Sequence, residues 1–241
     1  LIQAYPGQDV GVGIVNRRLY FFKVDSTEVW YNAGQTDFPF RPDRNLLFNF
    51  GCLTRNSIVS DFGYLFWLAR DKNGVGSVMM TQGQAPVKVS DESVDNVIAN
   101  LENPSDLDAW IYKDMGHVFY VISWATDDIT FLYDITSNTW SRLVVQPDSD
   151  PFDTKCFGKS RFPGSCHAYF NGKHYVGSYC KPIIYEMSRS FATIDGIPIV
   201  RRRVCRHFFD EAYRMIQVNS LQLDMEMGLG TVLPVTEAWD E

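Results

Sequence analysis

The stretch from Gly116 to Trp140 has the clearest pattern of apolar and polar positions in this chain. Aromatic and β-branched residues fill His117 to Trp124 and Ile129 to Tyr133, and such side chains favour a pleated, half-buried surface. Polar residues that bond nearby backbone groups in turns occupy most of Asp134 to Asn138. The pattern predicts two strands and a tight turn, with Trp140 closing the unit.

Strand-like segments of the same kind recur along most of the chain, separated by short turns. Asn171-Gly172 is the strongest hairpin signal, and Asp71 to Gly74 is another strong one. Asn16-Arg17 and Asp61-Phe62-Gly63 separate two further pairs of apolar runs. The additional segments predicted as strands are Val10–Val15, Leu19–Val24, Thr27–Tyr31, Ser57–Ser60, Tyr64–Arg70, Gly76–Met80, Ala109–Tyr112, Ser165–Phe170, Lys173–Tyr179, Ile183–Met187, Ile197–Arg203 and Met215–Met225.

One helix is predicted, from Asp91 to Asn100. Ser90 can cap its N-terminus, and Asp91 and Glu92 suit the positive end of the helix dipole. Apolar residues recur three and four positions apart, which is the spacing of a helix that lays one face on a sheet. These positions are Val94, Val97, Ile98 and Leu101.

Two loops are predicted where prolines interrupt the periodic pattern. Gln35 to Asn45 contains two prolines, and its Phe38-Pro39-Phe40 should tuck aromatic rings under a sheet. Gln146 to Asp153 is rich in Pro and Asp.

Four strand sets align on a central pair of ring-bearing residues, at intervals of roughly 50 residues. Three to four short strands per repeat of this length are what propeller blades need, and radial repetition leaves only short sheet edges. The sequence therefore predicts an all-β, β-propeller-like fold with kelch-like blades and one inserted helix; a β-sandwich with long hairpins is the alternative. The aligned pairs are Tyr20-Phe21, Phe66-Trp67, Phe119-Tyr120 and His174-Tyr175, with Trp30, Met79, Tyr133 and Tyr185 on the predicted closing strands.

Composition narrows the class of protein. Aromatic residues make up 15% of the chain, which favours strands over helices. The net charge of −7 disfavours broad electrostatic binding to nucleic acid, and no apolar run approaches the ~20 residues of a membrane-spanning helix. Five dispersed cysteines are typical of reduced thiols in a cytoplasm rather than of a disulfide framework.

The ends of the sequence suggest a fragment of a longer protein. The chain opens at Leu1 without methionine and ends at Ala238-Trp239-Asp240-Glu241 in sequence with a folded character. We expect residues 1–241 to form a single propeller-like domain that is incomplete at one or both ends.

Two acidic pairs in the sequence could serve as glycosidase carboxylates. Asp224 and Glu226 lie two apart on a predicted strand and would share a face. Glycosidase carboxylates need separations of ~5–9.5 Å across a cleft. A solvated strand face is the favoured interpretation, and Asp127-Asp128 is predicted to be a hairpin turn.

Cysteines and histidines suggest a zinc site only weakly. No Cys-x-x-Cys pair exists, and strand neighbours such as Cys166 and His167 point to opposite faces. Buried free cysteines are favoured. His117 and His174 could act as general bases, but no nucleophile is arranged around them, so core or blade-edge histidines are favoured. The other residues of the hypothetical zinc site are Cys156, Cys180, Cys205 and His207.

Two further patterns favour structural roles. The one basic cluster is Arg201-Arg202-Arg203 with Arg206 and His207. Three consecutive residues on a strand alternate faces, so a solvated or inter-subunit edge is favoured over DNA contact. Gly11-Val12-Gly13 lacks the third glycine and the helix of a nucleotide-binding fingerprint. No catalytic, cofactor-binding or metal-binding residue is therefore predicted.

Several segments carry a resemblance to known proteins. Tyr133-Asp134 followed by Asn138-Thr139-Trp140 looks like the end of a kelch repeat. From about Val10 to Gly228, the order and spacing of motifs resemble the packaged-DNA stabilisation proteins of short-tailed bacteriophages. The segments that carry this resemblance are Glu28–Gly34, Phe38–Phe40, Gly51-Cys52, Leu65–Leu68 with Gly74, Val87–Ser90, Gly116–Val121 with Tyr133-Asp134 and Trp140, and Leu221–Gly228.

Two departures qualify this resemblance. The family more often has Ile-Ser-Thr at the start of the helix, where this chain has Val87 to Ser90. Thr231 to Glu241 matches no part of the pattern. Family members are also longer at both ends, which agrees with the interpretation of the chain as a fragment.

The resemblance implies a structural virion protein. Such proteins are propeller-like tail accessory factors that are assembled in the host cytoplasm. They form an oligomeric ring below the portal and its adaptor proteins, retain the packaged genome and seat the tail needle protein. Neither a membrane nor sequence-specific nucleic acid is an expected partner. The candidate contact surfaces are the loops Gln35–Asn45, Gln146–Asp153 and Arg189–Gly196.

Two other functions remain open from the sequence. One is a kelch-like or glycosidase-like propeller enzyme, which clustered ionisable residues of perturbed pKa at a concave end would support. The other is a kelch adaptor that binds a cellular partner. Fold alone does not decide among the three.

Overall fold

A computed structural model describes residues 7–71, 74–144, 161–179, 181–194, 197–199, 220 and 222. The chain divides into two compact units, Leu1–Met187 and Ser188–Glu241, and each is described by itself. In its described part the second unit contains one hairpin, β17 (Thr193–Ile194) and β18 (Ile197–Pro198). That the whole chain forms a single domain stays a prediction.

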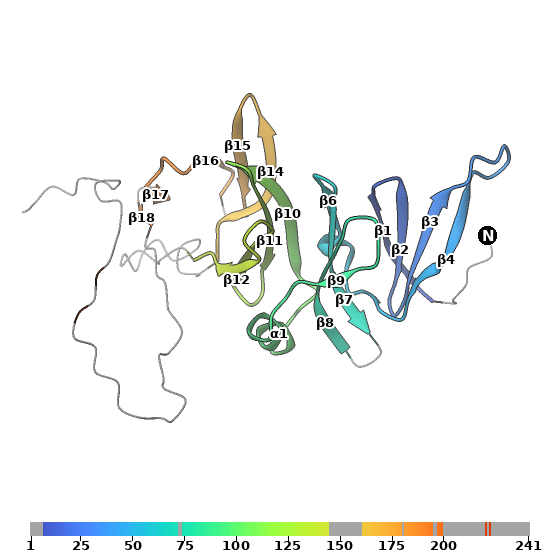
Figure 1. Cartoon of the computed structure of the whole chain (residues 1–241). Coiled ribbons are helices and arrows are strands. Elements are labelled where there is room, and N and C mark those ends of the chain that lie inside the picture. Colours follow the sequence, from blue (N-terminus) through green and yellow to red (C-terminus); the bar gives the residue numbers. More distant parts are fainter. Residues whose placement is uncertain are drawn as a thin grey trace, which may run out of the picture. The chain divides into compact units, whose positions relative to one another are not determined.

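Four antiparallel sheets follow one another along the described part of the first unit (Figure 1). The first, third and fourth are simple meanders; in the second the order is β5-β7-β8-β9, with β6 also pairing with β7. The first sheet contains β1 (Asp9–Val15), β2 (Arg18–Lys23), β3 (Thr27–Asn32) and β4 (Phe40–Phe48). The second contains β5 (Gly51–Cys52), β6 (Val59–Asp61), β7 (Tyr64–Asp71), β8 (Gly74–Thr81) and β9 (Val87–Lys88). The third contains β10 (Leu107–Asp114), β11 (His117–Trp124), β12 (Ile129–Asp134) and β13 (Thr139–Arg142), and the fourth β14 (Gly164–Phe170), β15 (Lys173–Ser178) and β16 (Ile184–Met187).

The predicted repeat is confirmed at the level of strands. Each aligned ring-bearing pair lies on the second strand of its sheet's hydrogen-bonding order: β2, β7, β11 and β15. The residues predicted on closing strands lie instead on the third strands, where Tyr133 pairs directly with Tyr120 and Tyr185 with Val176. A fourth strand follows in the first three sheets. The predicted closing strand is therefore one strand too early in the first three sheets, whereas Tyr185 lies on β16, the last strand of the fourth sheet as described.

Four hairpins lead into these second strands, from β1, β6, β10 and β14, and each turns in only two residues, both with positive φ. The pairs are Asn16-Arg17, Phe62-Gly63, Met115-Gly116 and Asn171-Gly172. Such turns match the right-handed twist of the strands that they join. The predicted turns at 16–17, 61–63 and 171–172 are thus confirmed, and Asp71 pairs with Gly74 as the predicted β7–β8 hairpin requires.

The loop predicted over Gln35–Asn45 is wrong in its second half, because β4 begins at Phe40. Pro42 lies opposite Trp30 on this strand, next to an irregularity in the register. Proline is found on edge strands such as β4 and at bulges, because a missing N–H can be accommodated there. Phe38 contacts Trp30 edge-on but stays about half exposed, so its ring is not tucked under the sheet.

The predicted helix is confirmed as α1 (Glu92–Ala99), but its cap is Asp91 rather than Ser90. The Asp91 carboxylate accepts a hydrogen bond from Val94 N at 2.8 Å. Ser90 is buried, accepts from Val78 N and donates to Asp95 Oδ1. The serine therefore joins the helix to β8 instead of capping it. The strand that was predicted to start at Ser57 starts two residues later, as β6 at Val59, because Arg55–Ser57 form the short 3₁₀ helix η1.

Strand β7 is buried on both faces and separates two apolar cores. Leu65 and Trp67 face the first sheet and contact Tyr20 and Phe22. Phe66 faces the third sheet and α1, within a cluster that includes Tyr120. A strand covered on both sides reads as a continuous apolar run, as this one does.

Trp140 anchors the end of the third sheet, as its position in the sequence predicted. Its indole N–H donates to Val89 O at 2.8 Å, just before α1. Its ring lies 4.9 Å from that of Tyr133 on the neighbouring strand. Trp140 thereby connects the third sheet to the segment that leads out of the second.

Several predicted segments lie outside the described residues. They are Gln146–Asp153, Arg201–Arg203 and all of Met215–Met225 except Ser220 and Gln222.

Candidate functional site

A cluster of rings lies between the third and fourth sheets, and we call it the histidine–aromatic cluster. Its members are His117, His167, His174, Tyr112, Phe119 and Tyr169. The register of the hairpins brings these residues together, because Tyr112 pairs with Phe119 across β10–β11 and Tyr169 with His174 across β14–β15. The cluster therefore forms part of the contact between two consecutive sheets.

The rings stack in sequence from one sheet to the next. His117 stacks on Phe119 at 5.8 Å, and Phe119 stacks on Tyr112 at 4.9 Å. The Tyr112 ring lies 5.6 Å from both His167 and His174, whose Nε2 and Nδ1 atoms are 2.9 Å apart. His117 and His174, the two candidate general bases, are thus half-buried residues on inner strands, packed among aromatic rings.

A carboxylate orients the first histidine of the cluster. Asp134 Oδ2 lies 2.8 Å from His117 Nδ1. Burial by itself raises the pKa of Asp134, but hydrogen bonds from Ser137, His117 and the Thr136 N–H outweigh it and lower the pKa below its ordinary value. The carboxylate therefore stays ionised and holds the His117 ring in its stacked position.

The surroundings of His167 shift the pKa of its imidazole ring. Burial lowers its pKa below the ordinary value of 6.5, and the neighbouring His174 lowers it further, while the Asp61 carboxylate acts in the opposite direction. The neutral form of His167 is thus the one that the fold favours.

The folded state should lose stability as the pH falls from 7.5 to 5. Because the folded pKa of His167 lies below the unfolded one, the unfolded state binds more protons between them. Stability present above pH 6.5 is therefore lost as the pH falls toward the folded pKa. The groups facing His167 are His174, Tyr112 and Asp61. Urea melts across this range measure the loss, and His167→Gln should make the pH dependence shallower; an unchanged slope would contradict the assignment.

The cysteine next to this cluster does not share its face. Cys166 lies opposite Gly177, where an added Cβ would come within 2.8 Å of the Cys166 sulfur. The thiol is exposed, which corrects the expectation of buried cysteines; Cys52 is buried as expected. Among the described residues, no group of three or more His, Cys, Asp or Glu side chains could hold a metal ion. Cys156, Cys180, Cys205 and His207 lie outside them, so the zinc question stays at the level of prediction.

The face of the fourth sheet that carries Cys166 is apolar and open. A shallow depression of about 560 Å³ is lined by Cys166, His167, Ala168, Tyr175, Gly177 and Ile184. Ile184 is 73% exposed at its edge. The depression offers almost no polar groups, so its chemistry is that of contact rather than of catalysis.

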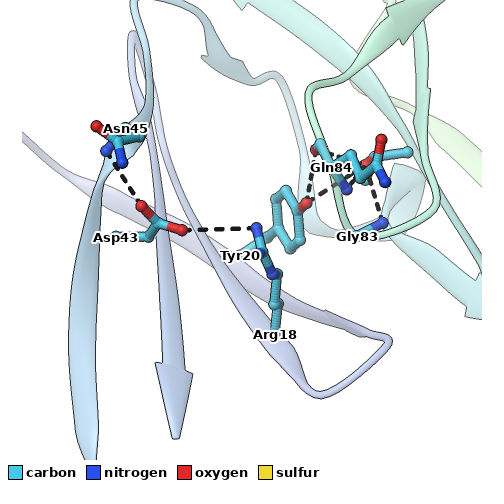
Figure 2. A network of polar contacts seen from close by, with 7 residues as sticks. Arg18, Tyr20, Asp43, Asn45, Gly83 and Gln84 are labelled. Carbon is cyan, nitrogen blue, oxygen red and sulfur yellow. Dashed lines mark hydrogen bonds and ion pairs between the residues drawn. The ribbon is translucent and has the colours of Figure 1, made fainter. Parts of the chain in front are cut away.

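A polar network connects the first sheet to the second (Figure 2). The Tyr20 hydroxyl on β2 donates to Gln84 O at 2.9 Å, and Thr81 Oγ1 donates to the same carbonyl at 2.8 Å. The Gly83 N–H in turn donates to Thr81 Oγ1. The network holds the turn after β8 against β2.

A second part of Figure 2 lies within the first sheet. Arg18 forms an ion pair with Asp43 at 3.6 Å, and Asp43 also accepts a hydrogen bond from Asn45 N. Both parts of the network tie strands or sheets together. Their role is structural.

The other candidate residues have structural roles or lie outside the described residues. Asp127 and Asp128 form the predicted turn, and the Asp127 carboxylate accepts hydrogen bonds from Glu102 N and Asn103 N. Gly11 and Gly13 lie on β1 as predicted, where a side chain on Gly13 would collide with Leu65. Asp224, Glu226, Arg201–Arg203 and Arg206 lie in the part of the chain that is not described.

The segments predicted as contact loops are loops only in part. Gln35–Asn45 is loop only as far as Pro39, and Arg189–Gly196 includes strand β17. Sequence reasoning missed a different exposed feature: Phe62 and Met115 lie at hairpin tips, and both side chains are exposed. A large apolar residue beside glycine at a turn, as in Asp61-Phe62-Gly63, was the available signal.

Comparison with known protein families gives a match over most of the chain. Residues 3–192 of the 241 match the model of the Phage_stabilise family, described as Bacteriophage P22 Gp10, beta-propeller. No curated protein matches the chain significantly. The match confirms the resemblance noted in the sequence and the predicted propeller class of the fold. In the part of the chain that is described, no helix has the length and apolar character needed to cross a membrane.

Proposed function

The chain belongs to the Phage_stabilise family of phage structural proteins, and from that premise we propose that it is a tail accessory factor of the virion. In this role it closes the portal channel, retains the packaged DNA and seats the tail needle. It works through interfaces and not as an enzyme. Its partners are other copies in a ring, the portal and adaptor proteins, and the needle protein.

The family match carries this proposal, and the build of the first unit supports it. Phe22 against Trp67 and Phe66 against Tyr120 join successive sheets through buried aromatic contacts at 4.9 Å and 4.4 Å. Aromatic side chains bury large areas in fixed geometries, so sheets joined in this way resist deformation. Resistance to deformation is what a plug under the pressure of packaged DNA needs.

Reconstitution on DNA-filled particles assembled without this protein tests the function. We expect the added chain to bind these particles, to give new density below the portal in electron micrographs, and to lower the fraction of DNA that nuclease can digest. An acidic protein of similar size that belongs to no virion is the control for nonspecific addition. Absence of new density, with no change in DNA release, would contradict the proposal, and so would hydrolysis of a glycoside by the purified chain.

A further inference from the structure

In the described part of the first unit, the fourth sheet is the one with the smallest share in an apolar core. The two buried apolar clusters draw on the first three sheets, α1 and their connections, and on no residue of β14, β15 or β16. Val176 is the only apolar side chain described on these three strands that is buried. Segments with few buried apolar contacts open at a lower free energy than the whole domain unfolds. We therefore expect the fourth sheet to be the first part of the unit to open.

The described contacts between the fourth sheet and the third gather at two places. Just before β14, Phe162 N donates to Thr130 Oγ1 at 3.2 Å. Further along the hairpin of β14 and β15, the rings of His167 and His174 each lie 5.6 Å from that of Tyr112 on β10. Beyond Phe162, the attachment of the sheet therefore depends on two titratable rings, which we call the histidine pair.

The hydrogen bond within the histidine pair limits how many protons the pair can hold. His167 Nε2 and His174 Nδ1 are 2.9 Å apart, and one of these nitrogens must carry no proton in order to accept from the other. One added proton can go to an outer ring nitrogen, which leaves the hydrogen bond intact and makes it charge-assisted. A second added proton puts an N–H on both facing nitrogens, because an imidazolium ring only donates. The hydrogen bond is then lost, and two positive rings face each other.

The surroundings of the histidine pair oppose the uptake of protons. The Asp61 carboxylate on β6 favours the charged form of His167, but burial and the neighbouring His174 outweigh it and lower the pKa of His167. Asp114 lies two positions after Tyr112 on β10 and therefore on the same side of that strand. A second proton meets the same burial together with a like charge. The titratable groups that face the pair from the strands around it are Asp61, Tyr112, Asp114, His117, Tyr169 and Tyr185.

We propose that the histidine pair is a pH-sensitive joint, which holds the fourth sheet against the third at neutral pH and releases β14, β15 and β16 when a second proton binds. In the opened form the two rings can separate and become solvated, so this form binds the second proton more readily than the closed form does. Closure is therefore fully stable above the ordinary His pKa of about 6.5 and is lost as the pH falls below it. The contact at Phe162 remains, so the release is local.

Hydrogen exchange of the purified chain between pH 7.5 and 5, expressed as protection factors, tests the joint. We expect the protection of the β14 and β15 amides to fall by at least about tenfold, which linkage gives for one additional proton over one pH unit. These amides should exchange through an opening that urea hardly promotes, because little surface is exposed. The amides of β7 should stay better protected at every pH and should respond strongly to urea.

NMR of the imidazole nitrogens counts the protons. The chain has four histidines, so their titrations can be followed one by one. We expect the histidine pair to titrate in two steps that belong to the pair as a whole, and the second step should coincide with the loss of protection in β14 and β15.

Two variants separate charge from packing. His174→Gln and His167→Gln each keep a side chain that can hydrogen-bond to the remaining ring, but neither leaves a pair that can carry two positive charges. In each, the fall in protection should shrink to less than about threefold, since one buried ring remains to titrate. His117→Gln is the matched control, because His117 belongs to the same cluster but lies 2.8 Å from Asp134 Oδ2 rather than from a histidine. This control should keep the full tenfold fall.

Three results would overturn the joint. The first is equal protection of β7 and β14 at pH 5, since protonation would then unfold the whole unit. The second is a tenfold fall that persists in both glutamine variants of the pair. The third is loss of protection in both variants already at pH 7.5, which would mean that ring packing and not charge holds the sheet; if one variant alone is open at pH 7.5, the other decides. The measurements need only the purified chain, so none of these results bears on the proposed role in the virion.

Discussion

Replacement of Tyr120 by alanine is expected to lower the free energy of unfolding by about 3–5 kcal/mol. Tyr120 lies on β11 with no exposed surface, in the core between the second and third sheets. Its ring stacks on Phe66 at 4.4 Å with an interplanar angle of 9°. Truncation would leave a cavity that the paired strands on either side cannot close. Urea melts followed by tryptophan fluorescence measure the loss.

Tyr120→Phe is the matched control, because it removes only the hydroxyl. That hydroxyl is buried and has no hydrogen-bond partner among the described residues, and burial raises the pKa of Tyr120 far above its ordinary value. Phenylalanine keeps the stacked ring and deletes an unsatisfied polar group, so we expect no loss of stability or a small gain. A neutral result for alanine would mean that the second and third sheets do not pack as described.

The sequence predicted the centre of each sheet well because the signals there are local. Strand β7 reads as one apolar run, since both of its faces are buried, and Asn171-Gly172 is a turn of the required geometry. The helix followed from its apolar spacing and from the polar and acidic residues at its start. These elements can be predicted without knowing which other segments of the chain they contact.

The misses depend on contacts between distant segments. Strand β4 contains Pro42 and several charged residues, and it is a strand only because it lies at the edge beside β3. Ser90 and Asp91 are both residue types that cap helices. Because the Ser90 hydroxyl accepts a hydrogen bond from Val78 N, Asp91 is the residue that caps α1. The exposure of Met115 likewise depends on a tip conformation that its residue type does not predict.

The candidate site was the least predictable feature. His167 and His174 were weighed separately in the sequence, and only the register of β14 with β15 places their nitrogens within hydrogen-bond distance. Apolar periodicity identifies strands but does not show which ends of different sheets meet.

A buried ion pair in the first sheet was also absent from the sequence analysis. Lys23 Nζ lies 2.6 Å from Glu28 Oε1, with the two side chains 1% and 3% exposed. The Trp30 indole donates to the other carboxylate oxygen at 3.3 Å. Lys23 ends β2 and Glu28 lies near the start of β3, on either side of a short turn. Charged residues beside a turn are ordinarily expected to be exposed to solvent. Their burial makes each charge depend on its partner.

Glu28→Gln should therefore lower the free energy of unfolding by about 3–5 kcal/mol, because it leaves the Lys23 ammonium buried without the carboxylate. Glutamine keeps the shape of the side chain, so the loss reports the charge. Lys23→Met should be costly for the reciprocal reason. The double variant Lys23→Met/Glu28→Leu replaces the pair by apolar groups of similar volume and should recover most of the stability. With Glu28→Leu as the fourth corner of a double-mutant cycle at pH 7, urea melts should give a coupling energy of more than about 3 kcal/mol, because the two single costs together far exceed the cost of the double variant. Strictly additive costs would show that the two charges do not act as a unit, and Glu28 would then contribute mainly through its hydrogen bond from Trp30.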